Sequence, residues 1–222
     1  MRPFFENNVL QQQPFKPMII VVDTTKAGSA SNTFVLPIIK DVTEVVKIEW
    51  GDGTKSIGVN GNNTHVYAAS GIYTVKIESR LFGGIYFNNL GDKAKITKIA
   101  NYGQGVSRLN IGSFYGCSSL LSIDIGNIVS NGADASNQYR GTALTTVPLF
   151  NLSNCTNAAN MFSGVTLTTQ SYSDFLINLA TLPLQSGVSF HGGNSKYNPA
   201  AAIARAYLVS NFGWTITDGG AA

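Results

Sequence analysis

Five residues decide the fold of the first half of the chain: Trp50-Gly51-Asp52-Gly53-Thr54. Trp50 is the last residue of the run Val45–Trp50, in which apolar and polar residues alternate as on a half-buried strand, and the other four residues follow this run. Asp-Gly is a strong turn signal, and the indole brings a large apolar area to a core. His65-Val66-Tyr67 and Gly71-Ile72-Tyr73-Thr74-Val75 follow, and the second of them alternates again. This pattern predicts short strands joined by tight turns.

The strands extend to both sides of this stretch. Met18–Asp23 and Thr33–Ile38 are rich in Ile and Val, and several strands at this spacing predict a β-sandwich over residues 18–90. Trp-Gly-Asp-Gly, His-x-Tyr and Gly-x-Tyr-x-Val in this order closely resemble the motif of PKD-family domains. The resemblance implies an immunoglobulin-like fold with adhesive or spacer roles and no chemistry. We interpret His65 as structural and expect Tyr67 and Tyr73 to pack with their hydroxyl groups outward.

Residues 91–170 carry an internal repeat. Its units begin at Ile96-x-x-Ile99, Leu120-x-x-Ile123-x-Ile125 and Leu144-x-x-Val147-x-Leu149, and a fainter unit begins at Leu167. An aromatic-x-Gly triplet precedes three of these positions: Phe114-Tyr115-Gly116, Tyr139-Arg140-Gly141 and Phe162-Ser163-Gly164. We expect the aromatic ring to fill the core and the glycine to permit a tight bend. A unit of this kind buries its apolar edge only by stacking on its neighbours, so the repeat predicts a solenoid.

One unit of this repeat has a close likeness. Val106–Ile123 resembles the unit of BspA-like leucine-rich repeats, in its Phe114, in its run Gly116-Cys117-Ser118-Ser119-Leu120 and in the Ile that follows. Asn160-Met161-Phe162-Ser163-Gly164 is similar to the Met-Phe variant of that unit. The resemblance implies a short leucine-rich-repeat solenoid and makes Cys117 a packing residue.

The C-terminal segment is expected to cap the solenoid. Ser171–Ala180 is predicted to be a helix, with Ser171 and Asp174 at capping-box spacing. Pro199–Ser210 is predicted to be a second helix, which Asn198 caps and Gly213 ends. Ile203, Tyr207 and Leu208 form its apolar stripe, and Trp214–Thr217 is a last strand. Such an ending also resembles the terminal cap of BspA-like proteins.

The sequence thus predicts a mainly β chain in three parts: an arm at residues 1–17, an immunoglobulin-like β-sandwich at 18–90, and repeats with a helical C-terminal cap at 91–222. The boundary is expected at Asn88-Asn89-Leu90-Gly91, where turn residues end the strand period. The arm shows no period. Phe4, Phe5 and Phe15 are candidates for docking it on a partner or a neighbouring subunit, and the alternative is an arm that folds back on its own domain.

Composition narrows the function classes. Charged residues make up 12% of the chain, against about 25% in typical soluble domains. The net charge of +3 is too small to indicate nucleic acid, and Lys93, Lys95 and Lys98 are interpreted as protection of an exposed strand edge. Neither a signal peptide nor a membrane span is visible. Cys117 and Cys155 are expected to be buried free thiols.

Catalytic chemistry finds little support in the sequence. Two histidines and scattered acids do not form a metal site or a known nucleotide motif, so no cofactor is expected. The enzyme class worth testing is a polysaccharide depolymerase, which needs two paired carboxylates. The acids of the second half do not fall at equivalent repeat positions: Asp92, Asp124, Asp134, Asp174 and Asp218.

Hydroxyl side chains recur at the positions after each leading apolar residue. Thr97, Thr145, Thr146 and Thr168 are therefore candidates for a ligand face on the outside of the sheet. The alternative is the ordinary preference of Thr for exposed strand positions.

Three functions remain. The first is a non-enzymatic bacteriophage virion protein, a capsid-decoration, head-fibre or tail-fibre component for adhesion or particle stabilisation on the virion surface. PKD-like and BspA-like modules resemble parts of bacterial and phage surface proteins, and a virion protein needs no export signal. The second is a bacterial cell-surface adhesin, and the third is the depolymerase. The expected partners are other virion proteins and a host surface glycan; a homo-oligomer is compatible with the sequence, whereas nucleic acid and membrane are not expected.

Overall fold

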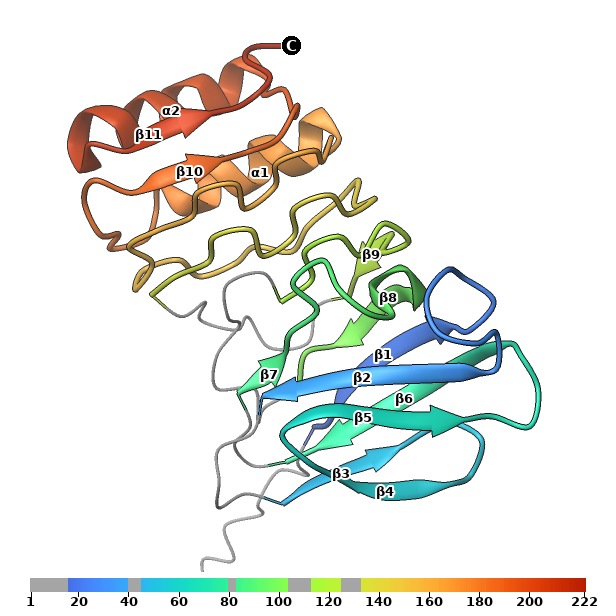
Figure 1. Cartoon of the computed structure of the whole chain (residues 1–222). Coiled ribbons are helices and arrows are strands. Elements are labelled where there is room, and N and C mark those ends of the chain that lie inside the picture. Colours follow the sequence, from blue (N-terminus) through green and yellow to red (C-terminus); the bar gives the residue numbers. More distant parts are fainter. Residues whose placement is uncertain (1–15, 40–44, 80–82, 104–112, 125–132) are drawn as a thin grey trace, which may run out of the picture.

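The computed structural model describes residues 16–39, 45–79, 83–103, 113–124 and 133–222. Of the described residues, 31% lie in strands and 15% in helices, so the expectation of a mainly β protein is confirmed. The three candidate docking residues of the arm, Phe4, Phe5 and Phe15, lie outside the described residues. Figure 1 shows the strands of the first half at one end of the molecule and the C-terminus at the other.

A six-stranded sheet forms the larger layer of the first half. Its order is β4-β3-β6-β1-β8-β9, and its pairs are antiparallel except for the parallel pair β8–β9. The strands are β1 (Met18–Asp23), β3 (Val46–Glu49), β4 (Lys55–Gly58), β6 (Ile72–Glu78), β8 (Ile96–Asn101) and β9 (Ser122–Ile123).

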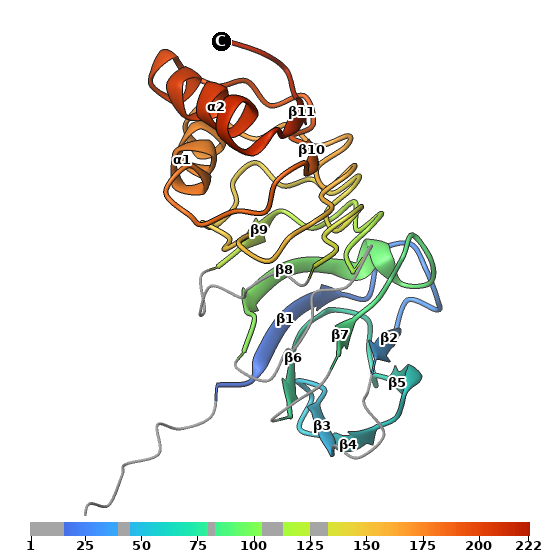
Figure 2. The ribbon, with the colours of Figure 1, turned by 90° about the vertical axis from the view of Figure 1, so that its left-hand side faces the viewer.

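A three-stranded antiparallel sheet lies against it. Its order is β5-β2-β7, from β2 (Thr33–Ile39), β5 (Gly61–Val66) and β7 (Gly84–Ile85). In β1 and β2, buried residues alternate with partly exposed ones, because successive side chains of a strand point to opposite faces. Ile20, Phe34 and Trp50 are buried members of the hydrophobic core, and Figure 2 shows the strands of the two sheets facing each other.

The six-stranded sheet crosses the boundary predicted near residues 88–91. β8 lies beyond that boundary, yet it pairs with β1 from Ile19↔Asn101 to Val22↔Ile96. On its other edge, β8 pairs with β9, the strand that begins the next repeat. One hydrophobic cluster also runs from Met18 to Trp214. The continuous sheet therefore counts against two independent modules, because a local turn signal says nothing of the long-range pairing that follows it.

Beyond β8, the chain winds in stacked turns, called rungs below. The rings of Phe114, Tyr139 and Phe162 are buried and stack in a column, with centroids 5.9 and 5.6 Å apart. Gly116, Gly141 and Gly164 have φ values of 79°, 67° and 77°, a conformation that favours glycine. Both expectations for the aromatic-x-Gly triplet are therefore confirmed. Leu149, placed inside by the repeat pattern, is instead exposed, and Phe150 is buried against Tyr139.

Two helices and a short parallel sheet cover the far end. The helices α1 (Thr169–Leu179) and α2 (Pro199–Phe212) pack side by side, next to β10 (Ser189–His191) and β11 (Thr215–Thr217) (Figure 2). Asn198 caps α2 through its side chain, and Gly213 ends it with φ 65°, as predicted. α1 begins earlier than predicted, because the Thr168 side chain accepts from Ser171 N and caps it.

The apolar stripe predicted for α2 is wrong at two positions. The buried residues of α2 are Ala201, Ala204 and Leu208, whereas Ile203 is 79% exposed and Tyr207 40%. Small alanine side chains let α2 approach its neighbours closely, and this packing decides which face turns inward. Trp214 is buried as expected, and its Nε1 donates to Gln185 O over 2.8 Å.

Both cysteines are buried free thiols, as expected, and burial raises the pKa of each. In the described ranges, no helix has the length and apolar character needed to cross a bilayer.

Candidate functional site

The motif residues of the first half form a stack of rings. The ring of His65 lies parallel to that of Trp50, with centroids 4.8 Å apart, and His65 Nε2 lies 2.8 Å from Asp52 Oδ2. Thr54 Oγ1 lies 3.4 Å from the same nitrogen. A proton relay through a histidine uses both ring nitrogens, so this arrangement does not pass a proton from Thr54 to Asp52. The contacts instead tie the turn after β3 to β5.

Asp52 is held in its charged form. Burial alone would raise the pKa of Asp52, but hydrogen bonds from Thr54 and His65 outweigh this effect and lower the pKa to about 2. Thr54 supplies two of them, from its backbone N at 2.9 Å and its Oγ1 at 2.6 Å. Asp52 is therefore a turn-fixing anion, not a residue that exchanges protons near neutral pH.

The expectation of an outward hydroxyl is wrong for Tyr67. Its side chain is 1% exposed, and its hydroxyl donates to Trp50 O over 3.0 Å. Burial raises the pKa of Tyr67 above its ordinary value. The ring of Tyr73 stacks on it at 3.7 Å, with its own hydroxyl donating to the exposed Ala69 O. A buried hydroxyl needs a partner, and the carbonyl at the end of β3 supplies it.

The lysines interpreted as edge protection have other roles. β8 is an inner strand, Lys98 pairs with Asp124 across 2.6 Å, and Lys95 is fully buried. Lys95 Nζ donates to three carbonyl groups, those of Ser29, Ala30 and Thr33, at 2.7–3.1 Å. A charged lysine is buried only when its donors are satisfied, and this loop satisfies them.

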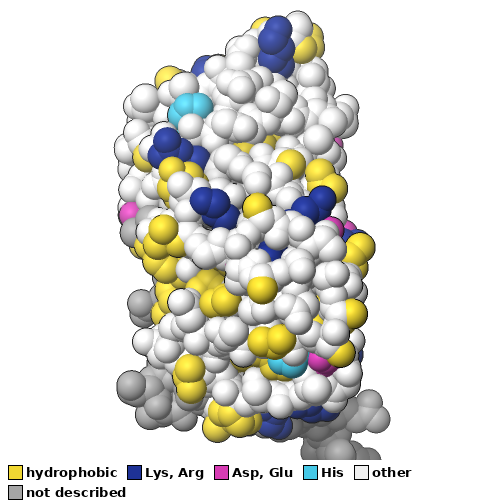
Figure 3. All heavy atoms as spheres, turned by 45° about the vertical axis from the view of Figure 1, so that its right-hand side comes forward, with side chains coloured by type: hydrophobic (Ala, Val, Ile, Leu, Met, Phe, Trp, Pro, Cys, Tyr) yellow, Lys and Arg dark blue, Asp and Glu magenta, His cyan; other side chains and the backbone are white. Residues whose placement is uncertain are grey.

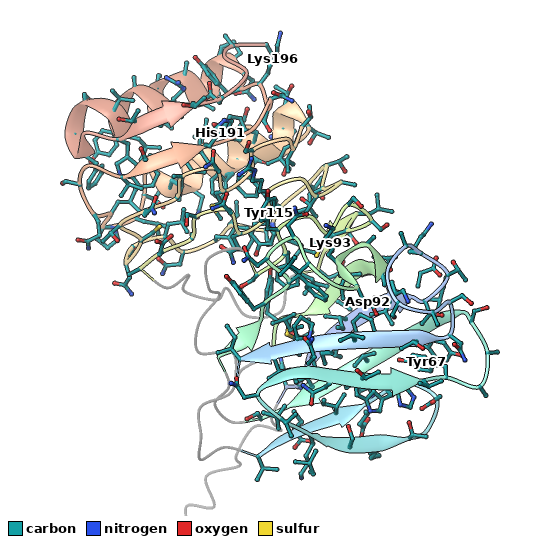
Figure 4. The ribbon with its side chains drawn as sticks, in the orientation of Figure 1. Tyr67, Asp92, Lys93, Tyr115, His191 and Lys196 are labelled. Atoms are coloured by element: carbon teal, nitrogen blue, oxygen red, sulfur yellow. The ribbon has the colours of Figure 1, made fainter. Side chains whose placement is uncertain are left out.

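Asp92 completes this buried cluster. Its carboxylate accepts from Ser29 N, Ser29 Oγ and Val35 N at 2.6–2.7 Å, and it lies 3.7 Å from Lys95 Nζ. Gly28 has φ 148°, and a Cβ there would lie 2.3 Å from Asp92 Oδ1, so glycine is required at that position. Asp92 and Lys95 thereby fix the start of the rungs to residues 28–35 of the first half, and Figure 4 labels Asp92 at this junction.

The candidate threonine face is not a strip of free hydroxyls. Thr145 and Thr146 are exposed, but Thr97 Oγ1 donates to Val21 O over 3.1 Å. Thr168 Oγ1 caps α1. Among the contacts described, one hydrogen bond joins two of these four threonines on adjacent rungs: the backbone N of Thr168 donates to Thr145 O. Two of the four hydroxyls thus serve the fold, and the ligand role of this face stays a prediction.

The acids of the second half are engaged in local contacts. Asp218 accepts from Arg205 Nε at 2.8 Å and from the Tyr172 hydroxyl at 2.9 Å. Asp134 accepts from Ser136 N, and Asp174 accepts from Gln170 Nε2. Within the described ranges, no three His, Cys, Asp or Glu side chains converge as metal ligands would.

A row of side chains on the turns of the rungs was missed in the sequence. The middle residues of successive triplets lie in register: Asn89 N donates to Tyr115 O, Gly116 N to Arg140 O, and Gly141 N to Ser163 O. The guanidinium of Arg140 lies 5.0 Å from the centre of the Tyr115 ring. We call Lys93, Tyr115, Arg140, His191 and Lys196 the cationic row. The repeat carries a signal for Tyr115 and Arg140, which are the middle residues of two triplets, but none for Lys93, His191 and Lys196, which lie outside the triplets.

The cationic row continues along the molecule. Lys93 reaches Asn89 O with its Nζ at 2.6 Å, and its Cδ would contact a Cβ at Gly116. On the rung that follows Phe162, His191 O accepts from Phe162 N, and His191 Nδ1 accepts from Gly193 N at 3.0 Å. Figure 4 shows Lys93, Tyr115, His191 and Lys196 in succession from the junction to the capped end.

A groove of about 390 Å³ lies beside the start of the row. It crosses the outward residues of β2, Val35, Pro37 and Ile39, and we call it the β2 groove. Its polar and aromatic lining comes from β5, from the turn before it and from the segment after β7: Asn60, Asn62, Tyr86 and Asn88. Asn88 lines the groove, and the next residue, Asn89, accepts a hydrogen bond from Lys93 of the row, so the groove and the row are neighbours at this point.

Comparison with known proteins adds no relative: no protein-family profile, no curated protein and no solved structure matches this chain.

Proposed function

We propose that this chain is a non-enzymatic surface protein of a bacteriophage virion, a capsid-decoration, head-fibre or tail-fibre component for adhesion or particle stabilisation. Residues 18–90, together with β8 in the larger sheet, would form its PKD-type immunoglobulin-like sandwich. Residues 91–222 would form its BspA-like leucine-rich repeats with the helical cap. The stack of Trp50 on His65 and the column of Phe114, Tyr139 and Phe162 support these assignments.

The observation that carries the proposal is the continuous connection between the sheets of the first half and the rungs, from which we expect a stiff body. β8 shares a sheet with β1, and the buried Asp92–Lys95 pair bonds to residues 28–35. A stiff body of this kind presents the turns of its rungs at a fixed position relative to its base. Displayed adhesion and spacer proteins require this property, whereas a hinged chain would lose binding energy to the ordering of its parts.

The contacts of the ionisable side chains agree with a non-catalytic role. Asp52 and His65 bind each other, and Asp218 binds Arg205. Asp92 accepts three hydrogen bonds and Asp124 pairs with Lys98. A carboxylate held in such contacts fixes local structure.

Immunogold labelling of purified phage particles tests the location. Antibodies against the recombinant chain should label the capsid or the tail, and mass spectrometry of the same particles should recover its peptides. Label confined to the bacterial envelope would contradict the proposal and favour the bacterial adhesin.

Deletion of residues 1–17 tests the docking arm. The deleted chain should keep its melting temperature but fail to join particles, since Phe4, Phe5 and Phe15 are the candidate docking residues. A large loss of thermal stability would show that the arm belongs to the fold.

A further inference from the structure

We infer that the cationic row and the β2 groove together bind an acidic polysaccharide. The inference rests on the proposed adhesive function and names the ligand class of its exposed surface. It concerns the turns of the rungs, not the threonine face that the sequence indicated.

The cationic row carries positive charge that the described protein does not neutralise. Among the described residues, Lys93, Arg140 and Lys196, like Lys47 on β3, take part in no ion pair, whereas Lys26, Lys55, Lys76, Lys98 and Arg205 each have a carboxylate partner. Figure 3 shows Lys and Arg side chains gathered on the upper part of one face, where Asp and Glu are sparse. Such a surface attracts an anion and holds it more weakly as salt increases.

Arg140 is positioned for a carboxylate. Its Nη1 donates to Asn137 Oδ1 at 3.2 Å, and its guanidinium lies 5.0 Å from the Tyr115 ring centre, so both contacts restrain the side chain. Restraint matters because an arginine that is already ordered loses less entropy when it binds. A planar guanidinium donates two parallel hydrogen bonds to a carboxylate, which makes Arg140 the best candidate for a uronic acid group.

The neighbouring groups suit sugar hydroxyls. Because His191 Nδ1 accepts from Gly193 N, a neutral His191 carries its proton on Nε2 and can donate from there. The β2 groove adds amide side chains from Asn62 and Asn88, each of which both donates and accepts. Its outward β2 residues and Tyr86 offer apolar surface to the carbon face of a sugar ring.

The length of the row favours a polymer over a single anion. Lys93 bonds to Asn89 on the first rung, Arg140 lies two rungs further on and His191 two rungs beyond it, and neighbouring rungs are separated by about 4.8 Å as neighbouring strands are. One small anion cannot contact all three, but a linear chain with repeated carboxylates can. Nucleic acid fits less well, since its bases need open aromatic faces and the cation of Arg140 already lies over the ring of Tyr115.

Titration calorimetry with alginate, a polymer of uronic acids, tests the inference on the full chain. Alginate should bind, neutral dextran should not, and added salt should weaken the binding. Arg140→Gln should raise Kd about tenfold, the scale of one lost charge-assisted hydrogen bond, and Lys93→Gln should raise it several-fold. Lys55→Gln is the matched control, because it removes an exposed positive charge on β4, outside both the row and the groove, and should leave Kd unchanged.

Three results would overturn the inference: dextran binding as well as alginate, Lys55→Gln weakening binding as much as Arg140→Gln, or a single-stranded oligothymidylate binding more tightly than alginate. Melting curves of each variant exclude misfolding as the cause. The particle labelling described above is independent of this test. If the antibody labels the particles but the protein does not bind alginate, the ligand inference alone is contradicted. If the protein binds alginate but is absent from the particles, the virion assignment alone is contradicted.

Discussion

At the scale of single residues, Asp52 makes a testable contribution to acid stability. Its pKa is about 2 in the folded chain, below the ordinary 3.8, because hydrogen bonds from Thr54 and His65 outweigh the opposing effect of burial. Because its pKa is lower in the folded state, the charged form of Asp52 stabilises the folded protein above pH 4. This stabilisation is lost as the pH falls through 2 and Asp52 takes up a proton.

The variant Asp52→Asn should therefore lower the free energy of unfolding at pH 7 by about 1–2 kcal/mol, a range that allows for solvent screening of a partly exposed carboxylate. Its stability should also fall less steeply than that of the natural chain between pH 4 and pH 2. Urea denaturation across this range measures both effects. If the free energy of unfolding depends on pH in the same way for the natural chain and for Asp52→Asn, then the contacts of Asp52 do not stabilise its charged form.

The buried pair at the junction gives a second prediction at this scale. Asp92→Asn or Lys95→Met leaves the other charge buried without its partner, at a cost of about 3–5 kcal/mol each. The double variant should cost clearly less than the sum, because it leaves no lone charge. Chemical denaturation of the three variants measures this coupling, and strictly additive costs would disprove the buried pair.

Sequence patterns predicted side chains well where the signal was local. The turn at Asp52-Gly53, the capping by Asn198 and the buried thiols follow from the residues nearby. The burial of Lys95 does not, because its partners lie more than 60 residues earlier in the chain. The outward hydroxyl predicted for Tyr67 is wrong for the same reason, since its acceptor is the distant Trp50 O.

At the scale of elements, the C-terminal cap closes the apolar end of the rungs. Trp214 is 2% exposed, lies against Phe190 and donates to Gln185 O. Trp214→Ala should therefore destabilise the protein by about 3–5 kcal/mol, as truncations of large buried aromatics do. Ile203→Ala on α2 is the control and should cost under about 1 kcal/mol, since Ile203 is largely exposed.

Chemical denaturation followed by circular dichroism measures both variants. Equal costs for Trp214→Ala and Ile203→Ala would mean that the cap does not cover a core. Both helices were predicted from the sequence, and Asn198 caps α2 as expected, but α1 is capped by Thr168 and not by the predicted Ser171. The buried face of α2 was not, because hydrophobicity alone favours Ile203 and Tyr207 over the alanines that are buried.

At the scale of the whole molecule, β8 joins the two halves. A chain that ends at residue 90 loses β8 and leaves one edge of β1 unpaired, whereas a chain that ends at residue 103 keeps β8, Asp92 and Lys95. The shorter chain should unfold at lower denaturant and aggregate, because an open strand edge pairs with other chains. Trp50 fluorescence and light scattering compare the two, and equal midpoints would restore a domain boundary near residue 90.

The repeat period predicted stacking, and the aromatic column confirms the role of its rings. The pairing of β8 with β1 was not predictable, because the turn residues at 88–91 are the same whether the next strand leaves the sheet or returns to it. The cationic row was hidden for a similar reason: only stacking brings Lys93, Arg140 and His191 to one face.

The central claim is that this chain binds a surface polymer without cleaving it. Its most direct test is the molar mass of the host's capsular polysaccharide, measured by size-exclusion chromatography with light scattering after incubation with excess protein and removal of the protein by protease. We expect a molar mass identical to that of untreated polymer. A progressive fall in molar mass would contradict it and identify the chain as a depolymerase.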